Sequence, residues 1–415
     1  MYNDCDPRVH PSTYVRLAEL RYSALFPSLR RLYCNLEDTS ISHIFLFQSP
    51  LLDSLSLSNI RGFENTVVEP FLASLSNSPQ IIRRIVLKSG QMSGEILKKS
   101  FVHFKQLRSL QLSDAVFLSD FSLLEVLGTL PSLENLTLEA NDPESHPAHA
   151  PENSNSQSGG LRYFAALESL HVTGSFFLIQ HLLGFIDSPC LKSIKIYPLI
   201  DRVYYDSERE HELENLLTPS MTIVATKWSQ SLTELTISSN TMEYSSGFTH
   251  RNSKFLTLLT NLCEIRKFCL VGWTMENNDD AVRCLAKSWP KLRYLALAVL
   301  QLPLHQSLVS LSTFRMIADN CSDLHYLHIP LDTSTIPPFD DFSSKKSPRH
   351  NLEVLYLGGP GRVHPLDQTM LECQIHVARN LDFIFPYLKT IDVQNGKWSG
   401  IRNLVKLCHD IRRSQ

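Results

Sequence analysis

The sequence predicts an α/β solenoid, in which a short strand and a helix alternate along the chain and stack on their neighbours. Three features predict it: an apolar spacing that recurs, a helical pattern between many of its copies, and a proline that often precedes the strand. The stretch PSLENLTLEAN, residues 131–141, shows the spacing L-x-x-L-x-L at Leu133, Leu136 and Leu138, and Asn141 lies three residues further on. A spacing of this kind that recurs along a chain indicates a repeat protein.

The spacing recurs throughout the chain when Ile, Val, Phe or Cys is allowed in place of Leu. About 13 copies lie between Leu29 and Leu388, and their mean period of about 30 residues falls in the upper range for leucine-rich repeats. The copies begin at Leu29, Leu52, Ile82, Leu107, Leu133, Leu167, Leu191, Leu232, Ile265, Leu292, Leu324, Leu352 and Leu388.

Helical patterns fill much of the chain between the copies. Residues 93–104, 119–130, 253–264 and 278–289 carry apolar side chains at intervals of three and four, the period of an amphipathic helix. A proline shortly before the strand ends such a helix and favours an extended backbone at the residue preceding it. These prolines are Pro27, Pro50, Pro131, Pro189, Pro290 and Pro386.

One strand and one helix of this size cannot bury their apolar faces alone, but stacked units form a continuous core. We therefore expect a right-handed leucine-rich-repeat solenoid, a horseshoe with a parallel inner β-sheet and outer helices, of about 13 irregular repeats. The alternative, an ordinary multi-domain α/β protein, does not explain so many copies in order. We expect an N-terminal cap segment at 1–26, the solenoid at 27–396 and a C-terminal capping helix at 397–415.

Three insertions interrupt the repeat. Residues 141–160 are rich in Pro, Ser and Asn, a composition typical of a disordered loop. Residues 197–215 are charged and should end in a helix, and 331–350 should be a third loop. The turn asparagine of the leucine-rich repeat is clear only at Asn141 and Asn240, so most turns must satisfy their backbone in another way.

Composition restricts the functional classes. The chain has 415 residues, 43% hydrophobic and 20% charged, with a formal net charge of −3 and a pI of about 6.6. Nucleic acids and anionic membranes both attract a basic protein surface, so neither is expected as the main partner. No apolar run of about 18 residues is present, and the N-terminus lacks a secretory signal pattern. Nine scattered cysteines without C-x-x-C favour reduced thiols, in the cytoplasm or nucleus.

The third and fifth positions of L-x-x-L-x-L point to the open, concave face of the sheet, because strand side chains alternate between faces. The basic residues Arg31, Arg84, Lys195 and Lys267 are too dispersed along the chain for a nucleic-acid stripe, and each should be solvated. In four of the earlier copies these positions are mostly small and polar. They are Ser54, Ser56, Ser109, Gln111, Asn135, Thr137, Ser169 and His171.

Three later copies place aromatic residues at these positions: Tyr294, Tyr326, His328 and Tyr356, beside Val354. Neighbouring strands lie about 4.8 Å apart, so we expect one contiguous patch, with the three tyrosines in register on successive strands. Tyrosine is common at protein-binding hot spots, and these residues are therefore our candidates for binding a protein target. The alternative is that the rings only pack on each other or under the 331–350 loop.

Catalytic, metal and cofactor sites are not predicted. His325 and His328 are three apart on a strand and face opposite sides, which prevents them from sharing an ion. The glycine-rich stretch GGPG, 358–361, lacks the lysine and helix start of a phosphate site and should be a turn. Cys408 and His409 are adjacent on the last helix and point apart, a poor geometry for a nucleophile and its base. No nucleophile-elbow, P-loop or zinc-protease motif is present. We therefore expect that the protein is not an enzyme.

The array resembles the leucine-rich-repeat region of fungal F-box-type proteins. The likeness is strongest at residues 16–60, continues through the irregular units with a P-x-L-x-x-L-x-L strand, and ends in the tail KWSGIRNLVKLCHDIRR, 397–413. It implies the substrate-recognition subunit of an SCF-type cullin–RING ubiquitin ligase, whose repeats hold the target while the F-box binds the adaptor. No F-box is evident before Leu29, so adaptor binding follows only if an F-box lies upstream. The alternative is a free-standing scaffold or inhibitor without ligase association.

Overall fold

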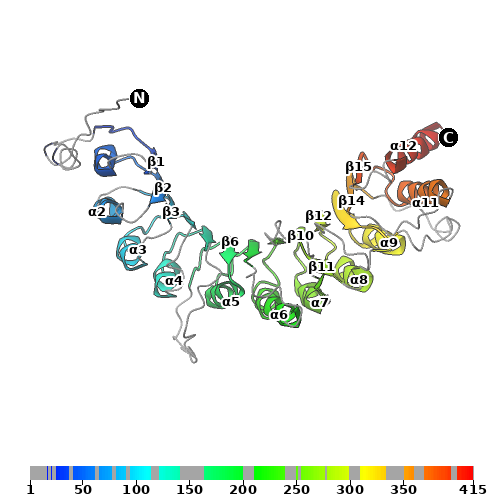
Figure 1. Ribbon diagram of the computed structural model, residues 1–415, viewed down its shortest axis with the longest axis horizontal. Coiled ribbons are helices and arrows are strands. Elements are labelled where there is room, and N and C mark those ends of the chain that lie inside the picture. The colour runs from blue at the N-terminus through cyan, green and yellow to red at the C-terminus, as the bar shows by residue number, and fades with distance from the viewer. Residues whose placement is uncertain are drawn as a thin grey trace, which may run out of the picture. The chain divides into compact units, whose positions relative to one another are not determined.

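In the computed structural model, the chain folds as two compact units, unit 1 over Met1–Leu191 and unit 2 over Lys192–Gln415. Figure 1 gives the labels of their elements. The structure describes residues 16, 20, 25–36, 41–60, 65–76, 81–89, 94–113, 121–140, 163–199, 210–238, 249–250, 254–275, 278–298, 309–332, 350–358, 369–393 and 400–414.

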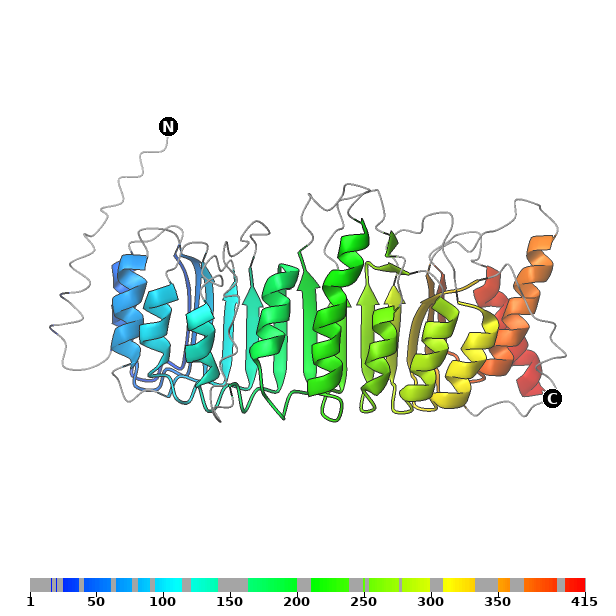
Figure 2. The ribbon, with the colours of Figure 1, turned by 90° about the horizontal axis from the view of Figure 1, so that it is seen from below.

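Unit 1 is a parallel sheet with helices along one face, as Figure 2 shows. Its strands follow one another in chain order and pair in parallel. They are β1 (Arg31–Asn35), β2 (Ser54–Ile60), β3 (Arg84–Ser89), β4 (Ser109–Ser113), β5 (Asn135–Glu139) and β6 (Ser169–Gly174). The helices are the 3-10 helix η1 (Ile41–Phe47) and α2 (Asn65–Ser76), α3 (Gly94–Phe101), α4 (Phe121–Gly128) and α5 (Phe176–Phe185).

Unit 2 repeats this plan with seven strands in one parallel sheet. They are β7 (Ser193–Pro198), β8 (Glu234–Ser238), β10 (Lys267–Val271), β12 (Tyr294–Ala298), β13 (Tyr326–Pro330), β14 (Val354–Gly358) and β15 (Thr390–Val393). The helices are α6 (Glu210–Lys227), α7 (Lys254–Leu258), the 3-10 helix η5 (Leu259–Asn261), α8 (Asn278–Ser288), α9 (Leu311–Asn320), α11 (Thr369–Ile384) and α12 (Gly400–Ser414). A separate parallel pair consists of β9 (Thr249–His250) and β11 (Thr274–Met275). Both units are leucine-rich-repeat solenoids, which confirms the predicted fold class.

The leucine positions of the repeat form the core between sheet and helices. In the copy that contains β5, Leu133, Leu136 and Leu138 are at most 1% exposed. Burying a leucine side chain stabilises a fold by about 1.5–3 kcal/mol, so recurrent burial of these positions drives the stacking. The first copy departs from the prediction, because Leu29 and Cys34 are only half-buried. Strand β1 pairs with β2 alone in the described part of the sheet, so less of its surface is covered.

Backbone hydrogen bonds link most strand starts to the preceding copy. The carbonyl of Arg108 accepts from the N–H groups of Glu134 and Asn135, both at 2.9 Å. This satisfies the donors at the strand start and fixes the register between copies. The same two-to-one pattern recurs at the carbonyls of Arg30, Asp53, Arg83, Glu134, Lys192, Thr233, Arg266, Arg293, His325 and Glu353.

In three copies a buried polar side chain closes the turn before the strand. Ser188 is 2% exposed; its Oγ donates to the Leu167 carbonyl at 2.7 Å and accepts from the Cys190 N–H at 3.2 Å. Ser49 and His350 bridge the chain in the same way. These residues satisfy backbone groups in the turns that precede the strands, whereas the repeat asparagine belongs to the turn that follows a strand. The two expected turn asparagines, at positions 141 and 240, lie outside the described residues.

The predicted helices are present with one difference. Helices α3, α4 and α8 lie within the predicted ranges 93–104, 119–130 and 278–289. The range 253–264 is instead divided between the short α7 and the 3-10 helix η5. The charged insertion 197–215 ends in α6, which begins at Glu210 as predicted. The expected loop 141–160 and residues 333–349 of the third loop lie outside the described residues.

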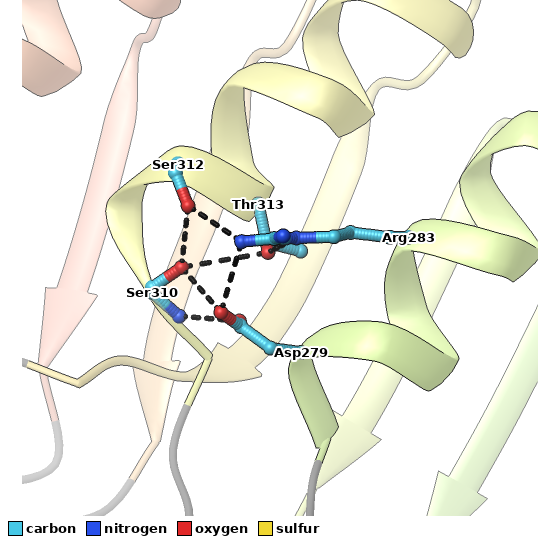
Figure 3. Close-up of polar contacts among 5 residues, drawn as sticks. All are labelled: Asp279, Arg283, Ser310, Ser312 and Thr313. Carbon is cyan, nitrogen blue, oxygen red and sulfur yellow. Dashed lines mark hydrogen bonds and ion pairs between the residues drawn. The ribbon is translucent and has the colours of Figure 1, made fainter.

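Polar side chains also join neighbouring helices in unit 2, as Figure 3 shows for α8 and α9. Asp279, in the first turn of α8, accepts from the N–H of Ser310 at 2.7 Å and from its Oγ at 2.6 Å. Arg283 donates through Nε to Thr313 Oγ1 at 2.9 Å and through Nη2 to Ser312 Oγ at 2.8 Å. Ser310 is the N-cap of α9, so a carboxylate of one repeat fixes the helix start of the next.

No helix in the described part of the chain has both the length and the apolar character that crossing a membrane requires.

Candidate protein-binding surface

The candidate surface lies on the open face of the unit 2 sheet, where β12, β13 and β14 follow one another. Apolar core residues alternate with open-face residues along each strand, and the open-face residues Tyr294, Tyr326, His328, Val354 and Tyr356 are half-buried, whereas Ala296 on β12 is buried. Leu327 is fully buried, whereas its neighbours Tyr326 and His328 are half-buried on the opposite face. The short strands of the repeat thus place aromatic side chains on a rigid base.

The aromatic side chains contact one another across the strands. The rings of Tyr294 and Tyr326 stack with centroids 4.0 Å apart and planes 3° from parallel. The Tyr356 ring lies 5.4 Å from that of Tyr326 and 5.7 Å from the His328 ring. Residues Tyr294, Tyr326, His328 and Tyr356 form one contiguous surface, which we name the aromatic strip. All the predicted site residues are therefore brought together.

The predicted register of Tyr356 is wrong. Tyr294 lies opposite Tyr326, as expected, but Val354 lies opposite Tyr326 on the next strand, and Tyr356 lies opposite His328. Tyr294 and Tyr326 occupy the third position of their repeats, whereas Tyr356 occupies the fifth. The ring of Tyr356 reaches Tyr326 diagonally, a distance that aromatic side chains can span.

Lys267 joins the strip, although the sequence predicted that it is solvated and dispersed. Its Cα lies opposite that of Tyr294 on β10, and its ammonium lies 5.3 Å from the centroid of the Tyr294 ring. An ammonium at this distance from an aromatic face makes a cation–π contact. The strand order places Lys267 and Tyr326 on opposite sides of Tyr294. The signal that could have revealed this contact was the shared third position of the three residues.

Burial in the strip favours the neutral forms of Tyr294 and His328. Burial raises the pKa of Tyr294, and a hydrogen bond with the Tyr326 hydroxyl raises it further. Burial also lowers the pKa of His328. Near neutral pH the strip therefore presents uncharged aromatic groups with polar edges, and the ammonium of Lys267 at one end. Such a surface suits contact with a protein, because rings with polar edges offer a large area and few rotatable bonds.

The other residues weighed in the sequence analysis lie apart from the aromatic strip or have other partners. His325 lies before β13 and is exposed, with Nδ1 2.5 Å from the carbonyl oxygen of Asp323. His409 Nε2 instead contacts Asp382 of α11 at 2.9 Å, and burial raises the pKa of the Cys408 thiol. Within the described residues no three His, Cys, Asp or Glu side chains are grouped to hold a metal ion. Gly358 ends β14, and 359–361 lie outside the described residues.

Comparison with known proteins adds similarity of fold. No protein-family model and no curated protein match the sequence. The crystal structure of the Rad7 and Elc1 complex in yeast is similar, with 16% identity over 92% of this chain and 82% of that chain and a TM-score of 0.42. An internalin, inlF, from Listeria monocytogenes shows 14% identity over 89% of this chain and 88% of that chain, with a TM-score of 0.42.

A third similar structure is the leucine-rich-repeat ectodomain of the plant membrane receptor kinase GASSHO1/SCHENGEN3 from Arabidopsis thaliana, in complex with CASPARIAN STRIP INTEGRITY FACTOR 2. It shows 15% identity over 80% of this chain and 33% of that chain, with a TM-score of 0.35. At these identities and TM-scores, the likeness says nothing about what this chain binds.

Proposed function

We propose that the chain is a protein-binding module and that the aromatic strip of unit 2 holds its target. The observation that carries this proposal is the contact between the four aromatic residues on an open sheet face, with Tyr294 and Tyr326 stacked at 4.0 Å. The stack fixes the rings before any partner arrives, so little side-chain entropy remains to be lost on binding. The fold supplies rigid strands below the rings, and the work of the module is recognition rather than catalysis.

The finer proposal is that the bound protein is a substrate for ubiquitination. This part of the proposal rests on the resemblance of residues 16–60 and 397–413 to fungal F-box-type proteins, which implies an SCF-type cullin–RING ligase. The alternative is a free-standing leucine-rich-repeat scaffold or inhibitor. In the ligase and in the scaffold or inhibitor, the target would bind the open face of the repeats. The two functions differ in the other proteins that accompany the target.

Affinity purification followed by mass spectrometry tests the role of the strip. The chain is tagged at its C-terminus at the native locus, as wild type and as the double variant Tyr326→Ala/Tyr356→Ala. Tyr387→Ala is the matched control, because Tyr387 is a 56% exposed tyrosine in the turn before β15, outside the strip. We expect the target to be recovered at least about tenfold less with the double variant, the effect of losing a hot spot, and unchanged with the control.

Equal recovery from the double variant and the wild type, with matching far-UV circular dichroism spectra, would exclude the strip as the target site. The same experiment separates the two finer versions of the function. Adaptor and cullin that co-purify with the wild type support the ligase. A discrete partner without adaptor or cullin supports the scaffold or inhibitor.

A further inference from the structure

The open face of unit 1 differs in chemistry from the aromatic strip. At the third position, strands β1 to β6 carry Arg31, Ser54, Arg84, Ser109, Asn135 and Ser169 in register. At the fifth position they carry Tyr33, Ser56, Val86, Gln111, Thr137 and His171. These two rows contain two arginines and no carboxylate, so an otherwise small and neutral surface is positive where β1, β2 and β3 lie side by side (Figure 1).

Arg31 and Arg84 flank Ser54 on the same row, although the sequence separates them widely. Strands in a sheet are about 4.8 Å apart, so the two arginine Cα atoms are about 10 Å apart. Ser54, between them on the open face, is only 8% exposed. These arginines are dispersed along the sequence, and the register of β1, β2 and β3 brings this pair to one row.

Arg30 and Arg83 extend the basic surface to the end of the sheet where β1 and β3 begin. Each immediately precedes an open-face arginine, and all four guanidinium-bearing residues are exposed. The backbone holds them in place, since the Arg30 carbonyl accepts from Asp53 and the Asp53 carbonyl accepts from Arg83, both N–H bonds being below 3.0 Å. Asp53 is the one carboxylate between them. Four cations against one carboxylate leave this end strongly positive.

These arginines are not neutralised within the described part of the protein. Arg108 immediately precedes β4, as Arg30 and Arg83 precede β1 and β3. Unlike them, it forms an ion pair, with Glu134 at 3.1 Å. The ion pairs between described residues include none of Arg30, Arg31, Arg83 and Arg84. Tyr33, beside Arg31 on β1, adds an aromatic ring that is 67% exposed. Guanidinium groups without partners, next to an exposed ring, fit a ligand that supplies carboxylates.

We propose that the open face of unit 1 binds an extended acidic segment of a partner protein, with Arg31 and Arg84 as its two anchors. Carboxylates two residues apart lie on one side of an extended segment, about 7 Å from each other, and two flexible arginine stems can meet that separation. Each guanidinium offers paired donors that match a carboxylate. Nucleic acid fits less well, because it needs a longer basic track, and the chain carries a net charge of −3.

A fluorescence-anisotropy titration of the full chain tests this proposal. The probe is a fluorescein-labelled peptide of alternating glutamate and serine, and the competitor is a single-stranded oligothymidine of similar length. We expect the wild type to bind the peptide and to bind it more weakly as salt increases. The double variant Arg31→Gln/Arg84→Gln should lose about tenfold in affinity for each arginine, the size of a charge-assisted hydrogen bond. Arg108→Gln, an exposed but paired arginine, should stay within about twofold.

The proposal fails if the wild type does not bind the peptide, or if the double variant binds as tightly as the wild type. It also fails if Arg108→Gln weakens binding as much as the double variant does, because the interaction is then a general charge effect. An oligothymidine that binds more tightly than the peptide and displaces it identifies the surface as a nucleic-acid site instead. Far-UV circular dichroism of each variant confirms that the fold is retained.

Discussion

Tyr294 and Tyr326, on successive strands of unit 2, stack with their ring planes 3° from parallel and their centroids 4.0 Å apart. Lys267 lies against Tyr294 from the preceding strand. Tyr294 is therefore enclosed from both sides, and this burial is the main reason that its pKa is raised. The stack is part of the candidate binding surface, and the ionisation of its member Tyr294 is linked to folding.

Tyr294→Phe should make the protein less sensitive to alkaline pH. An unfolded tyrosine ionises near its ordinary pKa of 10.0, whereas the folded chain keeps Tyr294 protonated to higher pH. The folded state therefore loses stability as pH rises past 10, because only the unfolded state gains from ionisation. Urea unfolding at pH 9.0 and pH 10.5 measures this loss, and we expect it to be smaller in the variant.

At pH 9.0, Tyr294→Phe should lower the free energy of unfolding by about 1 kcal/mol, the contribution of the hydrogen bond with Tyr326. Tyr387→Phe is the control, since Tyr387 is 56% exposed, and it should retain the wild-type loss between the two pH values. A Tyr294→Phe protein with the full wild-type loss would contradict the proposed linkage.

The repeat could be predicted from the sequence because its signal is local. The spacing of Leu133, Leu136 and Leu138 within one strand states which side chains enter the core, and strand alternation places the others on the open face. The burial of a core leucine can be predicted without knowing which residue it contacts, because any apolar neighbour from the next copy can pack against it. The fold class and the identity of the aromatic residues followed from this local pattern.

Contacts between side chains of different copies could not be predicted in the same way. The cation–π contact of Lys267 depends on the pairing of β10 with β12 and on the direction that its flexible side chain takes, and a local spacing states neither. Arg31 and Arg84 come to lie in one row, on either side of Ser54, because β2 pairs with both of their strands. Asp279 resembles an ordinary acidic residue in the first turn of a helix, while its partner Ser310 belongs to the next copy.

His350 should make unfolding depend on pH in the mildly acidic range. It is 1% exposed; its Nδ1 accepts from the Leu352 N–H at 3.1 Å, so its Nε2 must donate to the Cys321 carbonyl at 2.7 Å. The ring is thus neutral, and burial lowers its pKa below 6.5. The unfolded chain binds a proton near pH 6.5 that the folded chain resists, so this stability is complete above that pH and is lost as pH falls below it.

We expect His350→Gln to lower the free energy of unfolding by about 1–3 kcal/mol at pH 7.5, because the Leu352 N–H and the Cys321 carbonyl lose the imidazole that bridges them. Its further loss of stability between pH 7.5 and pH 5.5 should be smaller than that of the wild type. Ser188→Ala removes an equivalent bridge that does not titrate, so it should cost the same at both pH values. Urea unfolding measures all three proteins. An acid-induced loss in His350→Gln as large as that of the wild type would contradict the assignment.

Asp279 and Ser310 should be energetically coupled, because the carboxylate of one repeat accepts both polar groups of the other repeat's N-cap (Figure 3). Asp279→Ala should lower the free energy of unfolding by about 1–3 kcal/mol, since the Ser310 N–H and the Arg283 guanidinium lose their acceptor. Ser310→Ala should lower the free energy of unfolding by about 1 kcal/mol through the lost hydrogen bond from its Oγ to Asp279, and the double variant should cost less than the sum by at least about 0.5 kcal/mol. Asp280→Ala changes the neighbouring exposed carboxylate of the same helix turn and should stay within about 0.5 kcal/mol of the wild type. Costs that add within about 0.3 kcal/mol would contradict the coupling between Asp279 and Ser310.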